Sequence, residues 1–292
     1  MLTTFAPAKI NLNLHVGPVK PNGRHDLESL TVFSSEETAD RVVIAPAEKL
    51  SLAVIGPFAE ACGPVGDNLV MKAAYALRTV MKVEAGAQIT LVKHLPVAAG
   101  IGGGSSDAAA ALRLLNELWG GPRVDTHLLA LAENLGGDVP VCLRPQSTIM
   151  RGEGQRLSPV SLPGRVPAVL VNTGIDCPTG PVFRRFDESE GGSEFRQTAD
   201  PEIRSINDLI DWMNNTYNDL EGPAMSLRPE IAALLGELRD LRNQRAVRMS
   251  GSGATCFALF NSMENAASAA ALLSKAHPEW WVRATALGTP SI

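Results

Sequence analysis

Residues 96–107 carry the strongest chemical signal in the chain. They read Pro-Val-Ala-Ala-Gly-Ile-Gly-Gly-Gly-Ser-Ser-Asp and run directly into an alanine-rich segment. Glycine permits a positive φ and lets a ligand approach the backbone, while the unpaired N–H groups at a helix start attract an anion. We expect a helix over residues 107–118, with Asp107 as its capping acid. The loop and the helix start together predict a cradle for phosphate, and therefore a nucleotide.

This first glycine loop also has a competing interpretation. It matches neither the Walker pattern nor G-x-G-x-x-G, so a P-loop or a dinucleotide fold is disfavoured. Residues 104–108, however, nearly match the G-x-S-x-G elbow of serine hydrolases, and the chain order allows Ser106, Asp138 and His277 to form a triad. A long glycine loop is unlike the tight turn that such an elbow needs. The hydrolase stays an alternative, and phosphate binding is favoured.

Three further features have the composition of a binding cleft. A second glycine loop, Met-Ser-Gly-Ser-Gly-Ala-Thr at 249–255, precedes an apolar strand. A bulged turn would explain it alone, but beside the first loop it favours a backbone surface that closes over phosphate. Lys9 and Asp138 have small, apolar neighbours, which is typical of positions held rigidly at a cleft. An ordinary surface lysine and an ordinary turn acid are the plain alternatives.

Hydrophobic periodicity predicts the elements that position these residues. Three prolines and a glycine within 159–167 indicate a boundary, so we expect domains at 1–160 and 161–292. The polar segment 187–201 predicts a mobile surface loop. Strands are expected at 10–16, 27–33, 41–44, 50–54, 88–92, 168–172, 256–260 and 281–286, and a hairpin through 147–150. Helices are expected at 68–81, 107–118, 128–135, 203–213, 229–242 and 263–275.

Length, charge and cysteine usage narrow the class of protein. A chain of 292 residues favours two domains that share a cleft. The net charge of -5 argues against a nucleic-acid partner. The four cysteines are widely spaced, which makes a zinc site unexpected and predicts reduced, mostly buried thiols. Because we find neither a leader pattern nor an apolar run of bilayer length, we expect a cytoplasmic protein without a membrane partner.

Three segments, in chain order, resemble the motifs of the GHMP kinases (galacto-, homoserine, mevalonate and phosphomevalonate kinases). They are Pro-Ala-Lys-Ile-Asn-Leu at 7–12, the first glycine loop, and Ser-Gly-Ser-Gly at 250–253. The chain is similar to the branch of that superfamily that phosphorylates 4-diphosphocytidyl-2-C-methyl-D-erythritol (CDP-methylerythritol) in the non-mevalonate isoprenoid pathway. The segments carrying this closer resemblance are K-I-N-L-N-L at 9–14, H-D-L-E-S-L at 25–30, G-G-D-V-P at 136–140 and N-D-L-E at 218–221.

The resemblance covers nearly the whole chain and implies both a fold and a reaction. The fold would be α+β with two subdomains, an N-terminal part like domain 2 of ribosomal protein S5 and a ferredoxin-like C-terminal part. The active site would lie in the cleft between them. The implied reaction is ATP-dependent phosphorylation of the 2-hydroxyl of CDP-methylerythritol by a monomer or weak homodimer. Asp138 would take the proton from the hydroxyl, and Lys9 would polarise that oxygen and keep Asp138 ionised.

The resemblance also assigns binding residues. Mg²⁺ would accompany ATP with help from the hydroxyl of Ser105 or Ser106, without a dedicated set of protein metal ligands. The expected nucleotide-binding residues are Asn68, Pro96, Ala98, Gly100, Ile101, Gly102, Gly103, Gly104, Ser105 and Ser106. The expected substrate-binding residues are Asn11, Arg24, His25, Thr179, Phe183, Gly251, Ser252 and Gly253.

One residue departs from the family pattern. Arg24 precedes His25 where the family usually has tyrosine. A guanidinium can also stack on a base or pair with a diphosphate, so the change affects the expected recognition of cytosine by His25 and Phe183 rather than catalysis. Two further alternatives stay open. One is a GHMP kinase of another small alcohol, such as homoserine or a mevalonate derivative, and the other is a nucleotide-binding module without catalysis.

Overall fold

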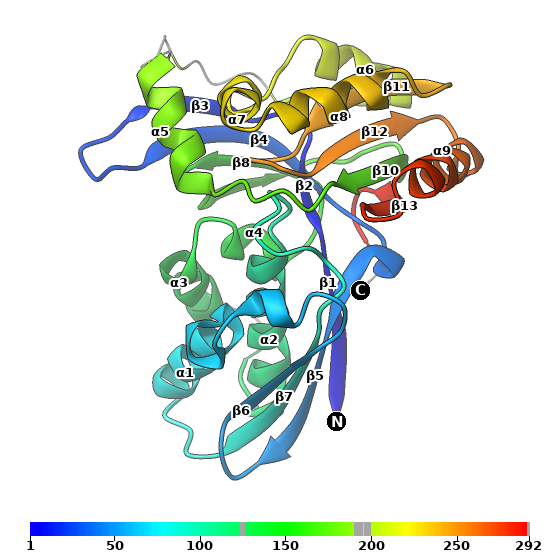
Figure 1. Cartoon of the computed structure of the whole chain (residues 1–292). Coiled ribbons are helices and arrows are strands. Elements are labelled where there is room, and N and C mark those ends of the chain that lie inside the picture. The colour runs from blue at the N-terminus through cyan, green and yellow to red at the C-terminus, as the bar shows by residue number, and fades with distance from the viewer. Residues whose placement is uncertain (123–125, 190–194, 196–199, 291–292) are drawn as a thin grey trace.

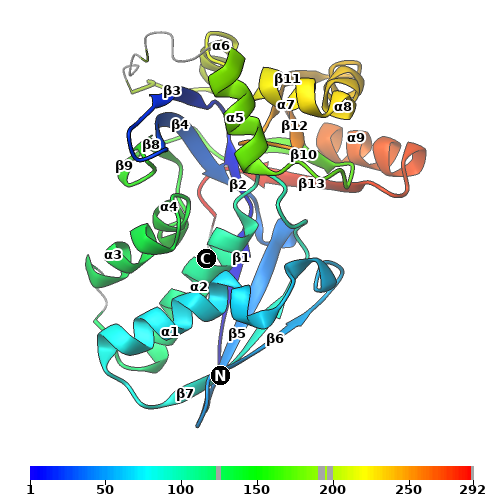
Figure 2. The same ribbon diagram turned by 60° about the vertical axis from the view of Figure 1, so that its left-hand side comes forward.

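The structure is a computed structural model that describes residues 1–122, 126–189, 195 and 200–290. Figures 1 and 2 show two packed parts, one built on a single sheet and the other on two sheets. The lower part in Figure 1 contains a sheet of order β1-β5-β7-β6, in which only the β6–β7 pair is parallel. Its strands are β1 (Leu2–Pro7), β5 (Ala39–Ala47), β6 (Ser51–Ile55) and β7 (Gly86–Val92).

Helices cover one face of this sheet, and α2 is the central one. The α2 helix (Gly103–Leu118) packs on β1 and β5, and α1 (Leu69–Met81) packs on α2. The side chain of Asn68 caps α1 by accepting the N–H of Val70 at 2.9 Å. The buried positions of α1 recur at helical spacing, which confirms the helix expected at 68–81. Two shorter helices complete this layer, α3 (Thr126–Leu135) and α4 (Val139–Leu143).

The upper part contains two antiparallel sheets. One has the order β2-β4-β8-β9 with β3 paired to β4, and the other has the order β11-β12-β10-β13. The first comprises β2 (Lys9–Asn11), β3 (His15–Val19), β4 (His25–Phe33), β8 (Thr148–Gly152) and β9 (Arg156–Pro159). The second comprises β10 (Val166–Asn172), β11 (Gln244–Met249), β12 (Cys256–Phe260) and β13 (Trp281–Leu287). The helices of this part are α5 (Thr179–Ser189), α6 (Ile206–Asn214), α7 (Glu221–Leu227), α8 (Pro229–Arg239) and α9 (Met263–Ala276).

A shared core joins segments that are distant in the sequence. Ile10 and Leu30, from β2 and β4, belong to the same buried cluster as Leu170 and Phe257, from β10 and β12. Strands of the N-terminal half therefore pack directly on strands of the C-terminal half. The boundary near residue 160 stays a prediction, because the upper part in Figure 1 contains strands from both sides of that residue.

Several elements differ from those expected. The strand expected over 10–16 is divided into β2 and β3, because Asn13 is buried between them and its Oδ1 accepts the N–H of Leu30 at 2.6 Å. Periodicity did not reveal α4, α5 or α7, which are short or polar. The loop expected at 187–201 is wrong at its start, since α5 extends to Ser189. Residues 190–194 and 196–199 of that segment lie outside the described residues.

Two expectations about the whole chain can be compared with the structure. All four cysteines are free thiols, and burial raises the pKa of Cys142, Cys177 and Cys256. Among the described residues, no helix combines the length and the apolar character needed to cross a bilayer.

Candidate active site

The first glycine loop joins β7 to α2 and has an unusual backbone. Gly100 and Gly102 have φ values of 73° and 59°, and Ala98 has φ 52°. Gly102 caps α2, which begins at Gly103. The unpaired N–H groups of a helix start carry partial positive charge, and Gly103, Gly104 and Ser105 line a cavity of about 340 Å³. The loop therefore has the geometry expected of an anion cradle.

The capping role expected for Asp107 is wrong. Because α2 begins four residues earlier than expected, Asp107 lies inside the helix and its carboxylate accepts a hydrogen bond from Lys93 Nζ at 2.6 Å. Burial raises the pKa of the Asp107 carboxyl, whereas the adjacent ammonium of Lys93 lowers it and favours the carboxylate. The glycines of the loop, with their freedom at positive φ, allow the helix to start without a side-chain cap.

The second glycine loop packs directly on the first. Ser250 Oγ donates to the carbonyl oxygen of Gly100 at 3.0 Å and accepts the N–H of Asn11 at 3.1 Å. The N–H of Thr255 donates to the carbonyl oxygen of Ala99 at 3.1 Å. A Cβ on Gly100 would lie only 2.5 Å from the carbonyl oxygen of Ser250. The two loops therefore form one unit, which also brings Gly251 and Ser252 to the cavity wall.

Lys9 and Asp138 form an ion pair at the cavity, although they are 129 positions apart in the sequence. Lys9 Nζ donates to Asp138 Oδ2 and to Asn11 Oδ1, each at 2.9 Å. The lysine side chain is 4% exposed, whereas that of Asp138 is 34% exposed. Asn11 is oriented in turn by its Nδ2, which donates to Ser29 Oγ at 2.7 Å. Buried charges need such partners, so this pair is held firmly while its carboxylate stays open to the cavity.

The far end of the cavity is formed by α5. Thr179 and Phe183, one helical turn apart, both line the cavity, and Thr179 Oγ1 lies 2.9 Å from Ser252 Oγ. The ring of Phe183 packs against His25 with centroids 5.0 Å apart. His25 is buried, and its Nδ1 lies 2.9 Å from the carbonyl oxygen of Gly17. An aromatic face and an imidazole are thus adjacent at this end.

Arg24 lies on the turn between β3 and β4, outside the cavity wall. Its guanidinium donates to Glu153 at 3.1 Å, and Glu153 also accepts hydrogen bonds from Lys20 and Asn22. These donors, with Lys20 first, lower the pKa of Glu153 to about 2. Arg24 thus ties its own turn to the β8–β9 hairpin, and its contact with substrate stays a prediction.

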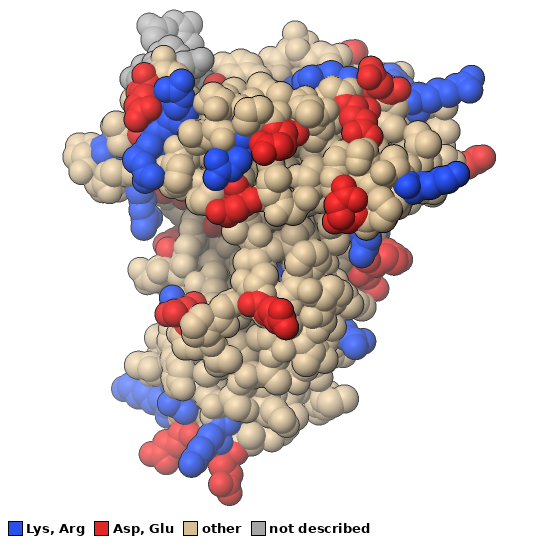
Figure 3. All heavy atoms as spheres, in the orientation of Figure 1, with Lys and Arg blue, Asp and Glu red and all other residues tan. Residues whose placement is uncertain are grey.

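The structure brings most of the expected site residues together around one cavity. Figure 3 shows this face hollowed between the two parts, with acidic and basic side chains mixed over it rather than gathered in one basic patch. Of the expected residues, those in the cavity wall are Lys9, Asn11, Ala98, Gly100, Gly102, Gly103, Gly104, Ser105, Asp138, Thr179, Phe183, Gly251 and Ser252. Those outside it are Arg24, His25, Asn68, Pro96, Ile101, Ser106 and Gly253.

Sequence reasoning missed the apolar part of the wall. It consists of Leu14, Leu27, Leu69, Met150 and Leu220, together with Ala99. These leucines were part of the expected strands, of the helix expected at 68–81 or of the N-D-L-E element. Hydrophobic periodicity did not distinguish a core position from a cavity position.

The hydrolase alternative is contradicted by the structure. Ser106 is 1% exposed inside α2. Asp138 is paired with Lys9, and His277 Nε2 lies 2.8 Å from Glu237 on α8 while its ring stacks on Trp280. A nucleophile needs a base within hydrogen-bond reach, and these three residues have other partners.

Family models match both halves of the chain. The model of the GHMP kinases N terminal domain matches residues 68–145, and that of the GHMP kinases C terminal matches residues 197–279. The chain therefore belongs to the GHMP kinases, whose α+β fold of two domains was expected from the motifs. It is an ATP-dependent small-molecule kinase.

Individual relatives define the branch of the superfamily. The 4-diphosphocytidyl-2-C-methyl-D-erythritol kinase of Hyphomonas neptunium is 52% identical, over 98% of this chain and 97% of its own length. The enzyme of that name from Methylobacterium radiotolerans is 47% identical, over 98% and 99%. A crystal structure of 4-(cytidine 5'-diphospho)-2C-methyl-D-erythritol kinase matches with a TM-score of 0.78 at 35% identity, covering 98% of this chain and 99% of that one. The chain is a member of the 4-diphosphocytidyl-2-C-methyl-D-erythritol kinases, as its motifs indicated.

More distant structures share the fold alone. The homoserine kinase of Cytophaga hutchinsonii matches with a TM-score of 0.70 at 17% identity, over 99% of this chain and 95% of that one. Such a likeness carries no information on substrate.

Proposed function

We propose that this kinase transfers the γ-phosphoryl group of ATP to the 2-hydroxyl of CDP-methylerythritol, with Asp138 as general base. The observation that carries the proposal is the Lys9–Asp138 pair, which shares one cavity with the start of α2. Phosphoryl transfer requires a positioned alcohol, a phosphate held in line with it, and stabilisation of the charge on the phosphoryl oxygens. All three requirements have candidate groups around this cavity.

The first glycine loop is the proposed phosphate site. Its glycines leave the N–H groups of Gly103, Gly104 and Ser105 at the cavity, where they would donate to the β- and γ-phosphates of ATP. Asn68 would lie near the nucleoside, because its neighbour Leu69 lines the cavity while its own side chain caps α1.

The site also fits magnesium bound mainly through the nucleotide. Among the described residues, no cluster of three or more His, Cys, Asp or Glu side chains is arranged to hold a metal. Mg²⁺ keeps several waters and commonly binds through substrate phosphates, so such a cluster is not required. Ser105 is the proposed hydroxyl ligand, since it lines the cavity and Ser106 is buried. When bound, the ion neutralises charge on the phosphate oxygens.

Lys9 and Asp138 would act together on the attacking hydroxyl. Asp138 accepts the proton of the alcohol while the alcohol oxygen forms a bond to the γ-phosphorus. The bond between that phosphorus and the oxygen of the leaving ADP breaks at the same time. Lys9 gives two of its three N–H bonds to Asp138 and Asn11 among the described residues, which leaves one for the substrate oxygen. The buried ammonium thus orients the base and stabilises negative charge at the alcohol.

We expect Phe183→Ala to weaken the cytidine end of the site selectively. Loss of a base–aromatic stack costs roughly 1–3 kcal/mol, so the KM for CDP-methylerythritol should rise about tenfold or more while the KM for ATP stays nearly unchanged. Steady-state kinetics with each substrate varied in turn measure both values. An equal rise in both KM values would contradict a cytosine contact at Phe183.

Arg24→Ala provides the matching comparison at the residue that precedes His25. Because Arg24 is 66% exposed and bonded to Glu153, we expect the KM for CDP-methylerythritol to rise less than threefold, well below the change at Phe183. A rise as large as that of Phe183→Ala would show that Arg24 itself binds the substrate, as its place in the sequence suggested.

A crystal structure with a nonhydrolysable ATP analogue and CDP-methylerythritol tests the whole arrangement. The analogue's triphosphate should lie on residues 100–105, and the 2-hydroxyl should lie within hydrogen-bond distance of Asp138. Homoserine and mevalonate should give no ADP release in a coupled assay in which CDP-methylerythritol does. The cytoplasmic location and the monomer or weak homodimer stay predictions. Sedimentation velocity would test the oligomeric state.

A further inference from the structure

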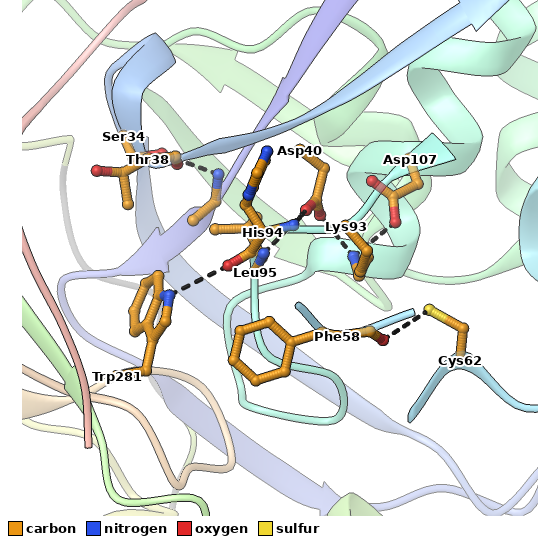
Figure 4. A network of polar contacts seen from close by, with 11 residues as sticks. Ser34, Thr38, Asp40, Phe58, Cys62, Lys93, His94, Leu95, Asp107 and Trp281 are labelled. Carbon is orange, nitrogen blue, oxygen red and sulfur yellow. Dashed lines mark hydrogen bonds and ion pairs between the residues drawn. The ribbon is translucent and has the colours of Figure 1, made fainter. Parts of the chain in front are cut away.

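A network of charged side chains lies buried beneath the first turn of α2 (Figure 4). Lys93 Nζ donates to Asp40 Oδ2 at 2.5 Å and to Asp107 Oδ2 at 2.6 Å. Each of the three residues is 2% exposed or less. Burying three charges is costly unless each is closely paired. The proton and phosphoryl transfers described above make no use of these side chains, so their burial needs another reason.

The network joins the two ends of the first glycine loop. Lys93 directly follows β7, and Asp107 lies in the second turn of α2, so their ion pair closes the segment 94–106. Asp40 Oδ1, on the neighbouring strand β5, accepts the N–H groups of His94 at 2.5 Å and Leu95 at 2.9 Å. A segment that contains four glycines has large conformational freedom. Cross-linking its ends removes part of that freedom before a ligand binds.

The ammonium of Lys93 also lies close to the phosphate cradle itself. A Cβ on Gly103, the first residue of α2, would lie 3.2 Å from Lys93 Nζ. Gly103 lines the cavity, so the network contacts the cradle from its buried side. The C-terminal half also contacts the start of this loop. Trp281 Nε1 donates to the carbonyl oxygen of His94 at 3.1 Å, as Figure 4 shows.

We propose that Asp40, Lys93 and Asp107 are positioning residues that hold the ends of the first glycine loop at the spacing that receives the nucleotide phosphates. This inference rests on the assignment of the loop to ATP. The carboxylate of Asp107 is the link to α2, whereas Asp40 and Lys93 tie the other end of the loop to the sheet. Removal of the Asp107 carboxylate therefore breaks the contact between the two ends of the loop. It leaves the Lys93–Asp40 ion pair in the interior with its charges balanced.

Asp107→Ala is the direct test. We expect the dissociation constant of a nonhydrolysable ATP analogue to rise about tenfold, while the KM for CDP-methylerythritol changes less than twofold. Calorimetric titration measures the first value without turnover, and steady-state kinetics measure the second. Wild-type affinity for the analogue in this variant overturns the proposal. If instead the wild-type protein binds the analogue away from this loop, the assignment of the ATP site fails first, so the two failures are distinguishable.

Leu115→Ala on the same helix is the matched control. Leu115 is fully buried in the core beneath α2, and its truncation destabilises the fold through a cavity without touching the loop. This variant should bind the analogue with wild-type affinity. Equal weakening in both variants would mean that general loss of stability lowers the affinity, and the positioning role would be wrong.

A triple substitution covers the case in which Asp107→Ala does not fold. Asp40→Asn, Lys93→Met and Asp107→Leu together remove every charge of the network, an exchange that often preserves stability. The amide oxygen of the asparagine still accepts the N–H groups of His94 and Leu95 in this variant. We expect a folded protein whose affinity for the analogue is still about tenfold weaker. A folded triple variant with wild-type affinity overturns the proposal.

Discussion

Asp138→Asn should lower kcat by about three orders of magnitude and leave the binding of ATP nearly unchanged. General-base catalysis contributes roughly 10²–10⁴ to a rate, and the amide cannot take the proton of the alcohol. The substitution keeps the size of the side chain and an acceptor oxygen for Lys9 Nζ, so the local geometry is expected to survive. A coupled ADP-release assay measures kcat, and calorimetric titration with a nonhydrolysable analogue measures the affinity.

Asp211→Asn controls for the loss of one negative charge. Asp211 is exposed on α6 and does not line the cavity, so this variant should retain wild-type kcat and affinity. The assignment of Asp138 as the base is wrong if Asp138→Asn retains wild-type turnover. A variant that loses affinity for the analogue as strongly as turnover would instead show that Asp138 helps to hold the nucleotide.

The local chemistry of the site could be predicted from the sequence because backbone requirements leave a visible signature. Glycines at 100 and 102 are needed for positive φ, and the same stretch leads into a helix, so loop and helix start were evident together. Lys9 and Asp138 were also expected in one site. They are 129 positions apart, and their spacing in the sequence does not by itself predict that they touch. The resemblance to a family supplied that information.

What could not be predicted depends on long-range packing. Asp107 was interpreted as a helix cap because local sequence cannot show that Lys93 and Asp40 lie beneath it. Arg24 was expected at the substrate because it stands where the family usually has tyrosine, and that contact stays a prediction. Its bond to Glu153 could not be predicted, because Glu153 lies on a different hairpin. In both cases the charged side chain has a partner that is distant in the sequence, and local sequence does not show that partner. Ion pairs between residues distant in the sequence depend on the tertiary arrangement, which hydrophobic periodicity does not report.

Gly100→Ala should reduce kcat/KM for ATP about a hundredfold, because it separates the two glycine loops. The added Cβ would lie 2.5 Å from the carbonyl oxygen of Ser250 and 2.6 Å from that of Gly253. Both are backbone atoms that cannot rotate away, so the loops must move apart, and a displacement of about 1 Å at a reacting group can cost about 10² in rate. The left-handed φ of 73° adds strain of roughly 1 kcal/mol for alanine.

Gly120→Ala separates the steric effect of this substitution from the backbone strain. Gly120 has φ 71°, nearly the value at Gly100, but a Cβ there would meet no atom within 4 Å. The control should therefore lose a similar amount of stability to strain, measured by denaturant unfolding, and keep its kcat/KM for ATP. If both alanine variants lost activity equally, backbone strain alone would account for the loss, and contact between the loops would not be what shapes the phosphate site. A hundredfold loss confined to Gly100→Ala would instead mean that the second loop holds the first in its binding geometry, which follows from the hydrogen bond between Ser250 and Gly100.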